Sequence, residues 1–267
     1  MLNFHCKPVY DMNDLRRIVE ILRSPGGCPW DMEQTHESIR RNLLEEAYEV
    51  CEAIDKKNPD HLKEELGDLL MQVVFHSRIE EEDGTFDLDN VADTACKKLI
   101  SRHPHVFGGE SVSGSREVID NWDEIKSREK SHTSVTKTMS DVAESLPALW
   151  RAEKIQKKAA KVGFDWPDFS GAMDKLVEEL SELKEALEEG ARARENVVEE
   201  LGDLLFAAVN VARLLDIDPE TALHKSCLKF IRRFDYIESE SIKIGRALLD
   251  MSLEDMEELY NKSKEAK

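Results

Sequence analysis

Residues 43–70 read LLEEAYEVCEAIDKKNPDHLKEELGDLL, and this stretch decides the fold. At about 100° per residue, the apolar positions of 43–54 form one stripe along a helix. The leucine and valine positions of 62–73 form a second stripe, and Asn58-Pro59 interrupts the pattern between them. The stretch therefore predicts two helices that are joined by a short turn and pack antiparallel.

The acidic residues of these two helices fall on one side of the predicted hairpin. Glu46 and Glu49 flank the first apolar stripe, and Glu65 and Asp68 lie on the same-handed flank of the second. Same-handed flanks of an antiparallel pair point to the same side, so these carboxylates converge. Their mutual repulsion would raise their pKa values unless cations lay between them. Hard oxygen ligands of this kind favour Mg²⁺, with Mn²⁺ as a substitute.

The same pattern returns in the second half of the chain. LVEELSELKEAL at 176–187 aligns with 43–54, and EELGDLL occurs at both 64–70 and 199–205. Identical order and near-identical spacing indicate an internal duplication. Each half also has one basic i, i+4 pair in a later helix and one aromatic residue at a matching position. The second-half acids are Glu179, Glu182, Glu200 and Asp203. Lys98 and Arg102 of the first half match Lys229 and Arg233 of the second, and Trp122 matches Tyr260.

Apolar residues recur at three and four along almost the whole chain, which predicts an all-α protein. Two tandem domains are expected at 1–128 and 146–267, joined by an exposed Ser-, Thr- and Lys-rich linker at 129–145. The predicted helices span about 11–23, 35–57, 60–81, 88–102, 115–129, 146–161, 170–189, 193–215, 219–240 and 252–265.

Charge and composition argue against several classes of binding partner. The formal charge of −19 argues against nucleic acid or an anionic membrane as a partner. No long apolar run or charged-then-apolar leader occurs, and the five cysteines are scattered without a C-x-x-C pair, so we expect a cytoplasmic protein with free thiols. A polyanionic small molecule would need a cation to bind here.

Two glycines favour a ligand site over a solvated acidic surface. Gly67 and Gly202 each cost a helix interior about 1 kcal/mol relative to alanine. Close approach of a neighbouring helix, or of a ligand, beside Asp68 and Asp203 would offset that cost. The basic pairs would then meet phosphate oxygens, which carboxylates alone repel. The sequence therefore predicts a metal-and-phosphate site.

The acidic motifs, together with GGCPWD at 26–31, RHPHVFG at 102–108 and GFDWPD at 163–168, resemble the MazG nucleoside triphosphate pyrophosphohydrolases. The resemblance implies tandem four-helix-bundle-like domains that work as a dimer and convert NTP and water to NMP and pyrophosphate with Mg²⁺. It implies that the two acidic quartets are the metal ligands. It also implies that Lys98, Arg102, Lys229 and Arg233 hold phosphates.

The two repeats differ one turn before the first ligand, where Asn42 precedes Glu46 but Lys175 precedes Glu179. Lys175 offers the second site another phosphate contact, so we predict that the C-terminal site is the better catalyst. Trp122 and Tyr260 either pack in the core or stack on the base of the nucleotide. Two alternatives remain: a non-catalytic helical dimer that senses nucleotide or binds a protein, and a narrower enzyme such as a dUTP/dCTP pyrophosphatase or a phosphoribosyl-ATP pyrophosphohydrolase.

Overall fold

The computed structural model describes residues 4–109, 111–115, 117–118, 121–122, 125, 134–188 and 194–265. The chain divides into two compact units, Met1–Lys126 and Ser127–Lys267. All regular secondary structure of the described residues is helical, so the predicted all-α class is confirmed. No described helix combines the length and hydropathy that a membrane span requires.

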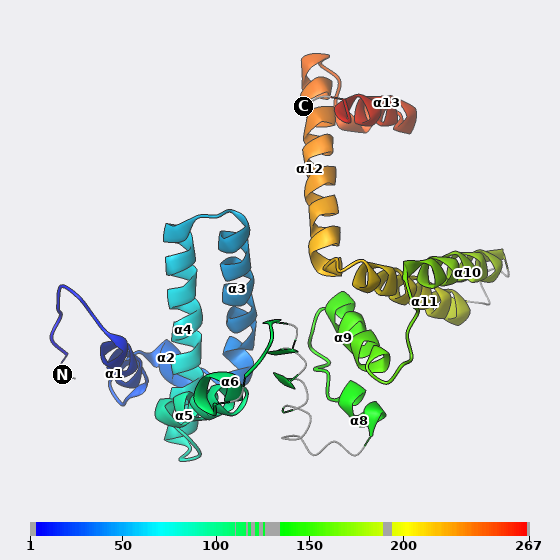
Figure 1. Cartoon of the computed structure of the whole chain (residues 1–267). Coiled ribbons are helices and arrows are strands. Elements are labelled where there is room, and N and C mark those ends of the chain that lie inside the picture. Colours follow the sequence, from blue (N-terminus) through cyan, green and yellow to red (C-terminus); the bar gives the residue numbers. More distant parts are fainter. Residues whose placement is uncertain are drawn as a thin grey trace. The chain divides into compact units, whose positions relative to one another are not determined.

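The first unit is built around the predicted hairpin (Figure 1). Thr35 starts the first hairpin helix with a capping box, and Asn58 followed by Pro59 starts the second. The antiparallel pair thus begins and ends where local capping residues predict. The helices of the unit are α1 (Met12–Arg23), α2 (Pro29–Glu33), α3 (His36–Asp55), α4 (Pro59–Glu82), α5 (Leu88–Ser101) and α6 (Pro104–Phe107).

The apolar core of the first unit lies at the end of the hairpin opposite its turn. Val19 of α1 packs there against Ile39 of α3 and Val74, Phe75 and Ile79 of α4. In Figure 1, α1, α2 and α5 all lie near this end. Among the described helices of this unit, Figure 1 draws none beside the half of the hairpin nearer Asn58-Pro59.

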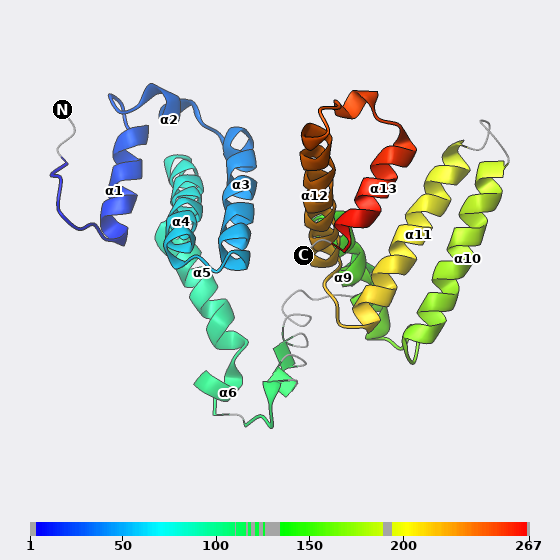
Figure 2. The same cartoon turned by 90° about the horizontal axis from the view of Figure 1, so that it is seen from above.

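The second unit contains a matching hairpin of α10 and α11, seen side by side in Figure 2. Helix α9 packs on α11, where the amide of Gln156 donates a hydrogen bond to the Phe206 carbonyl at 2.8 Å. Helix α12 runs away from the hairpin, and α13 packs back on α12 (Figure 1). The elements are α8 (Val135–Ser140), α9 (Ala148–Ala160), α10 (Phe169–Glu188), α11 (Arg194–Leu214), α12 (Pro219–Lys243), η2 (Leu248–Asp250) and α13 (Leu253–Ser263).

The segment at 129–145 contains structure that the linker hypothesis did not include. Helix α8 lies within it and begins at Ser134, whose side chain accepts a hydrogen bond from the Lys137 amide. Val142, just after this helix, is buried. A short helix with a good cap can form without the long apolar stripe that the sequence argument required. The helix predicted at 115–129 lies largely outside the described residues.

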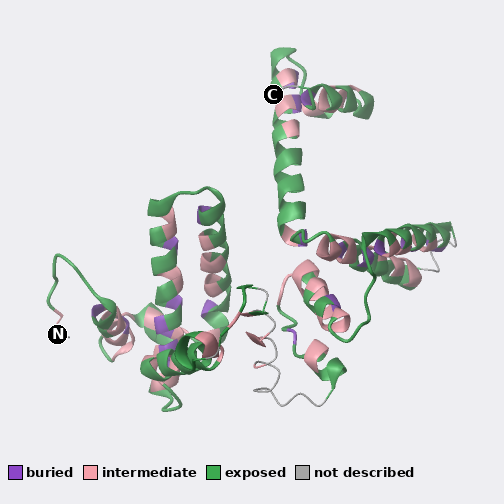
Figure 3. Ribbon diagram, viewed as in Figure 1, coloured by how far each residue is buried: buried purple, intermediate pink, exposed green. Residues whose placement is uncertain are grey.

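Both hairpins leave one apolar stripe exposed. On α4, Leu66 is 48% and Leu70 is 40% exposed, and on α11 Leu201 is 46% and Leu205 is 52% exposed. Figure 3 also shows α12 exposed along most of its length. Large apolar side chains that recur at helical spacing on a surface indicate a face that packs against something else.

Candidate metal and phosphate site

The first hairpin brings three of its predicted acidic residues together. Ligand oxygens of Glu46 and Glu49 on α3 and of Glu65 on α4 all lie within 4.8 Å of one another. Asp68, one turn after Glu65, is close enough to act electrostatically on both Glu46 and Glu65. The antiparallel geometry therefore brings together carboxylates from both helices of the hairpin.

Burial and repulsion set the charge state of this cluster. Burial, followed by the negative charges of Asp68 and Glu49, raises the pKa of Glu46. Burial and the charge of Glu49 raise the pKa of Glu65, which is only 8% exposed. His61 Nε2 lies 2.9 Å from Glu65 Oε1 in an ion-pair contact. The carboxylates of this cluster therefore repel one another, and a bound divalent cation would reduce that repulsion.

The second hairpin repeats the arrangement. Ligand oxygens of Glu179, Glu182 and Glu200 lie within 4.8 Å of one another. Burial and then the charge of Asp203 raise the pKa of Glu200, and burial also raises the pKa of Glu182. Three residues of each predicted quartet therefore lie together on their own hairpin, and the fourth, Asp68 or Asp203, is close enough to act on them electrostatically.

Lys175 distinguishes the second cluster from the first. Its Nζ lies 2.7 Å from Glu179 Oε1 and 2.8 Å from Glu178 Oε1, and these two carboxylates raise the lysine pKa. The first cluster has Asn42 at this turn. The Lys175 ammonium thus contacts an acidic residue of the second cluster directly.

The two helix glycines open onto space rather than onto a neighbouring helix. A Cβ added at Gly67 or at Gly202 would meet nothing within 4 Å apart from its own helix. Within the described residues, the neighbouring-helix explanation is therefore wrong for a single chain. At these two glycines no described residue of another helix lies against the hairpin.

The predicted phosphate-binding residues are not all gathered at the carboxylates. Lys229 and Arg233 lie on α12, which runs away from the α10–α11 hairpin (Figure 1). Arg233 stacks over the Tyr260 ring with 5.4 Å to the ring centroid, so those two predicted residues do meet. The role of Lys229 and Arg233 as phosphate contacts therefore stays a prediction.

The corresponding residues of the first unit lie at the end of α5. Lys98 is in its last turn and Arg102 is its C-cap residue, and α5 packs on α4. The Trp122 ring meets the His103 ring edge to face at 4.9 Å between centroids. Trp122 therefore packs on the loop that follows α5.

Sequence reasoning missed His61. It stands four residues before Glu65 on α4, and the Asn58 side chain accepts a hydrogen bond from its amide at 3.3 Å. The spacing H-x-x-x-E, which puts both side chains on one helix face, was the signal that could have identified it.

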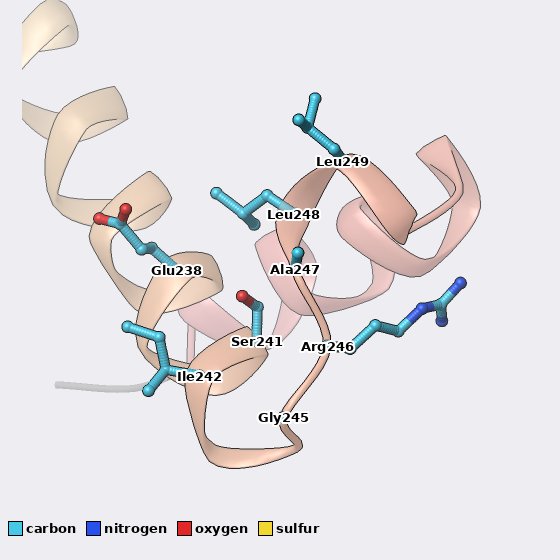
Figure 4. Close-up of a pocket in the computed structure, with 8 residues that line it drawn as sticks. All are labelled: Glu238, Ser241, Ile242, Gly245, Arg246, Ala247, Leu248 and Leu249. Carbon is cyan, nitrogen blue, oxygen red and sulfur yellow. The ribbon is translucent and has the colours of Figure 1, made fainter.

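A hollow at the far end of α12 is not part of either cluster. Figure 4 shows it between Glu238, Ser241 and Ile242 of α12 and the loop from Gly245 to Leu249. Its Arg246 points away from Ile242 and is held by the Asp255 carboxylate at 2.7 Å. With its cation already paired, the hollow offers little to a phosphate.

Comparisons with known proteins agree with the duplicated site. Residues 34–107 and 169–237 each match the MazG nucleotide pyrophosphohydrolase domain. The chain is 45% identical over 251 residues to the nucleoside triphosphate pyrophosphohydrolase/pyrophosphatase MazG of Thermotoga maritima, with 94% of each chain covered. It is 42% identical over 257 residues to the nucleoside triphosphate pyrophosphohydrolase of Escherichia coli K12, covering 95% of this chain and 98% of that one. An uncharacterized protein, YabN of Bacillus subtilis, is 46% identical over 256 residues, which cover 96% of this chain and 52% of the relative.

A tandem all-α chain with a carboxylate cluster on each of two helical hairpins defines the class. The chain belongs to the MazG nucleotide pyrophosphohydrolase family. The predicted tandem architecture and the predicted enzyme class, a nucleoside triphosphate pyrophosphohydrolase, are confirmed.

Proposed function

We propose that this chain hydrolyses a broad range of NTPs and dNTPs to the monophosphate and pyrophosphate with Mg²⁺ at its carboxylate clusters, in the cytoplasm. The observation that carries the proposal is the convergence of acidic residues from both helices of each hairpin. A solvated acidic surface would place its charges apart to reduce repulsion, whereas here they lie within 4.8 Å of one another.

The donor set fits a hard divalent cation. Every proposed ligand is a carboxylate, which is the donor that Mg²⁺ accepts most readily. In the first unit the ligands are Glu46, Glu49, Glu65 and Asp68, and in the second they are Glu179, Glu182, Glu200 and Asp203. When bound, the ion supplies Lewis acidity toward phosphate oxygens and lowers the pKa of water.

The chain's own residues hold the substrate around that cluster. Lys175 lies on Glu178 and Glu179 and can turn to a phosphate oxygen without leaving the site. We propose that Glu45 or Glu178, each next in sequence to the first ligand of its set, orients a water molecule. The remaining proposed substrate contacts are Lys98, Arg102, Trp122, Lys229, Arg233 and Tyr260.

A homodimer completes this arrangement. The exposed stripes with Leu66 on α4 and Leu201 on α11 are the faces that a second hairpin would cover. Because α12 runs away from its own hairpin, Lys229 and Arg233 of one copy can serve the cluster of another. A bundle of two hairpins would also bury the apolar surface that one hairpin leaves to water.

Product analysis tests the reaction. The purified chain is incubated with Mg²⁺ and each of the eight common NTPs and dNTPs, and NMP, NDP, pyrophosphate and phosphate are separated. We expect NMP and pyrophosphate in equal amounts and no turnover in excess EDTA. Release of NDP and phosphate as the main products, or full activity in EDTA, would overturn the proposal.

A further inference from the structure

The loop before α10 carries an aromatic ring that lies on the helix it precedes. A Cβ added at Gly171, in the first turn of α10, would meet three atoms of the Trp166 ring at 2.5, 2.8 and 3.1 Å. The indole therefore fits in this position only because residue 171 has no side chain. One side of the ring covers the helix at Gly171, yet Trp166 is still 45% exposed. Part of the ring is thus open to another molecule.

Hydrogen bonds hold the loop on both sides of Trp166. Arg213 of α11, whose side chain is only 8% exposed, binds the Asp165 carboxylate with both terminal nitrogens, and its Nη1 lies 3.0 Å from Oδ2. Asp165 Oδ1 also accepts a hydrogen bond from the Trp166 amide at 2.9 Å. After the ring, Asp168 Oδ1 accepts one from the Ser170 amide at 2.7 Å. The backbone that carries the ring is therefore already ordered, which lowers the entropic cost of binding a ligand there.

The ring lies along α10 from the second carboxylate cluster. Gly171, Lys175 and Glu179 follow one another at four-residue steps, so they share one face of the helix. Lys175 Nζ lies 2.7 Å from Glu179 Oε1, and Glu179 belongs to the cluster. At 1.5 Å per residue, the distance along the helix from Gly171 to Glu179 is about 12 Å. A nucleoside triphosphate whose phosphates reach the cluster has its base at a comparable distance from it.

The groups along this face match the parts of a nucleoside triphosphate. The carboxylates with their cation suit the phosphates, the Lys175 ammonium suits the remaining negative charge, and an indole suits a base, because every base has a flat face that can stack. We propose that Trp166, seated on Gly171, stacks on the nucleobase of the substrate at the C-terminal site. The inference rests on the proposed function, because it requires the phosphates to bind at the second cluster.

The first hairpin has a side chain at the position of this glycine. The alignment of the two repeats puts Ser38 opposite Gly171. Ser38 Oγ donates a hydrogen bond to Gln34 Oε1 at 2.8 Å and accepts one from the Thr35 amide at 2.9 Å. A hydroxymethyl group that is bonded to its own neighbours therefore takes the space in which an indole would lie. Stacking at this position is thus assigned to the second unit alone.

Binding of an ATP analogue tests the assignment without turnover. In α,β-methylene ATP, a carbon replaces the bridging oxygen of the bond that the proposed reaction cleaves. The full chain carries Glu65→Gln and Asp68→Asn, which weaken the first cluster, and the analogue is titrated with Mg²⁺ by calorimetry. Trp166→Leu should raise the Kd about tenfold or more, because the base loses its aromatic surface, and Trp166→Phe should retain most of the affinity. The Kd for inorganic triphosphate, which has no base, should change less than about twofold.

A second variant moves the ring without removing it. The methyl group of Gly171→Ala displaces the indole, so the Kd for the analogue should rise while the Kd for inorganic triphosphate stays the same. This variant also gives an answer if Trp166→Leu does not fold. The matched control is Phe164→Leu, which removes an 82% exposed ring from the same loop and should change neither Kd. Circular dichroism checks that each variant retains its helices.

The outcomes separate this inference from the proposed function. If the chain binds neither α,β-methylene ATP nor inorganic triphosphate and does not hydrolyse ATP, the proposed function fails and this inference with it. If the chain hydrolyses ATP but Trp166→Leu changes neither Kd, or raises both equally, the base does not stack on Trp166. An equal effect of Phe164→Leu would also overturn the assignment. In these last cases the proposed function is unaffected.

Discussion

Replacing Gly202 by alanine should have opposite effects on the stability of one chain and on the formation of a dimer. Gly202 lies in the interior of α11, where alanine is favoured over glycine by about 1 kcal/mol. A Cβ at this position meets nothing within 4 Å of the same chain outside its own helix. Judged from one chain alone, the substitution should therefore stabilise the protein.

In a dimer the same substitution should weaken the association of the two copies. Gly202 lies beside Leu201 and close to Leu205, which are 46% and 52% exposed and form the face that a second hairpin would cover. An extra methyl group in a tightly packed contact costs about 1–3 kcal/mol. A two-fold interface repeats each contact, so the total is about 2–6 kcal/mol. The dimer Kd should then rise about 30-fold or more.

Sedimentation velocity over a dilution series, without nucleotide, measures this Kd, and thermal melting checks the fold. We expect a weaker dimer whose helices melt no earlier than those of the original chain at matched monomer content. A Gly202→Ala protein with an unchanged Kd would refute the reasoning that a second copy approaches this glycine. An unchanged Kd with lost turnover would assign the open space to the ligand instead.

Three further outcomes follow from the charges of the clusters and of the first core. Glu200→Gln should abolish most turnover and Glu65→Gln should cost less, because the second cluster has Lys175 beside its ligands; a dead Glu65→Gln enzyme with near-normal kcat in Glu200→Gln would reverse this order. In EDTA at neutral pH, Glu46→Gln should raise the melting temperature. The pKa of Glu46 is raised in the folded protein, so its charged form destabilises the fold above that pKa. Added Mg²⁺ should remove the gain, and a lower melting temperature of the variant in EDTA would contradict the repulsion. Burial and His36 lower the pKa of His76, so the unfolded chain takes up a proton there first as the pH falls below 6.5. Stability measured with denaturant should therefore fall between pH 7.5 and 5.5, and less so in His76→Gln; equal losses in both proteins would exclude His76 as the cause.

The helical hairpins could be predicted because their signals are local. The sequence predicted a helix at 35–57 and the structure has His36–Asp55, since Thr35 caps one end and Asn58-Pro59 interrupts the pattern beyond the other. The convergence of the acids followed from the same geometry, because antiparallel packing and helix periodicity suffice to place Glu46 near Glu65. These features need no knowledge of distant segments.

Features that depend on tertiary packing could not be predicted in this way. The periodicity of α12 locates the helix but not its direction, so the sequence did not predict that α12 runs away from the α10–α11 hairpin. The position of Lys175 directly on Glu179 depends on a rotamer choice, although its helix position was correct. The contact of His61 with Glu65 was not predicted, although the i, i+4 spacing on one helix indicates it.

The hairpin turn at Asn58-Pro59 also has a consequence for folding and for evolution. Because all proposed ligands of the first cluster lie between Glu46 and Asp68, the site forms through contacts that are short along the chain. Local contacts form quickly and lose little loop entropy, so the cluster can assemble before the rest of its unit. A gene segment that encodes one such hairpin carries a complete ligand set with it. Duplication of that segment therefore copies the whole proposed ligand set at once, and each copy can then acquire its own neighbour, His61 in one and Lys175 in the other.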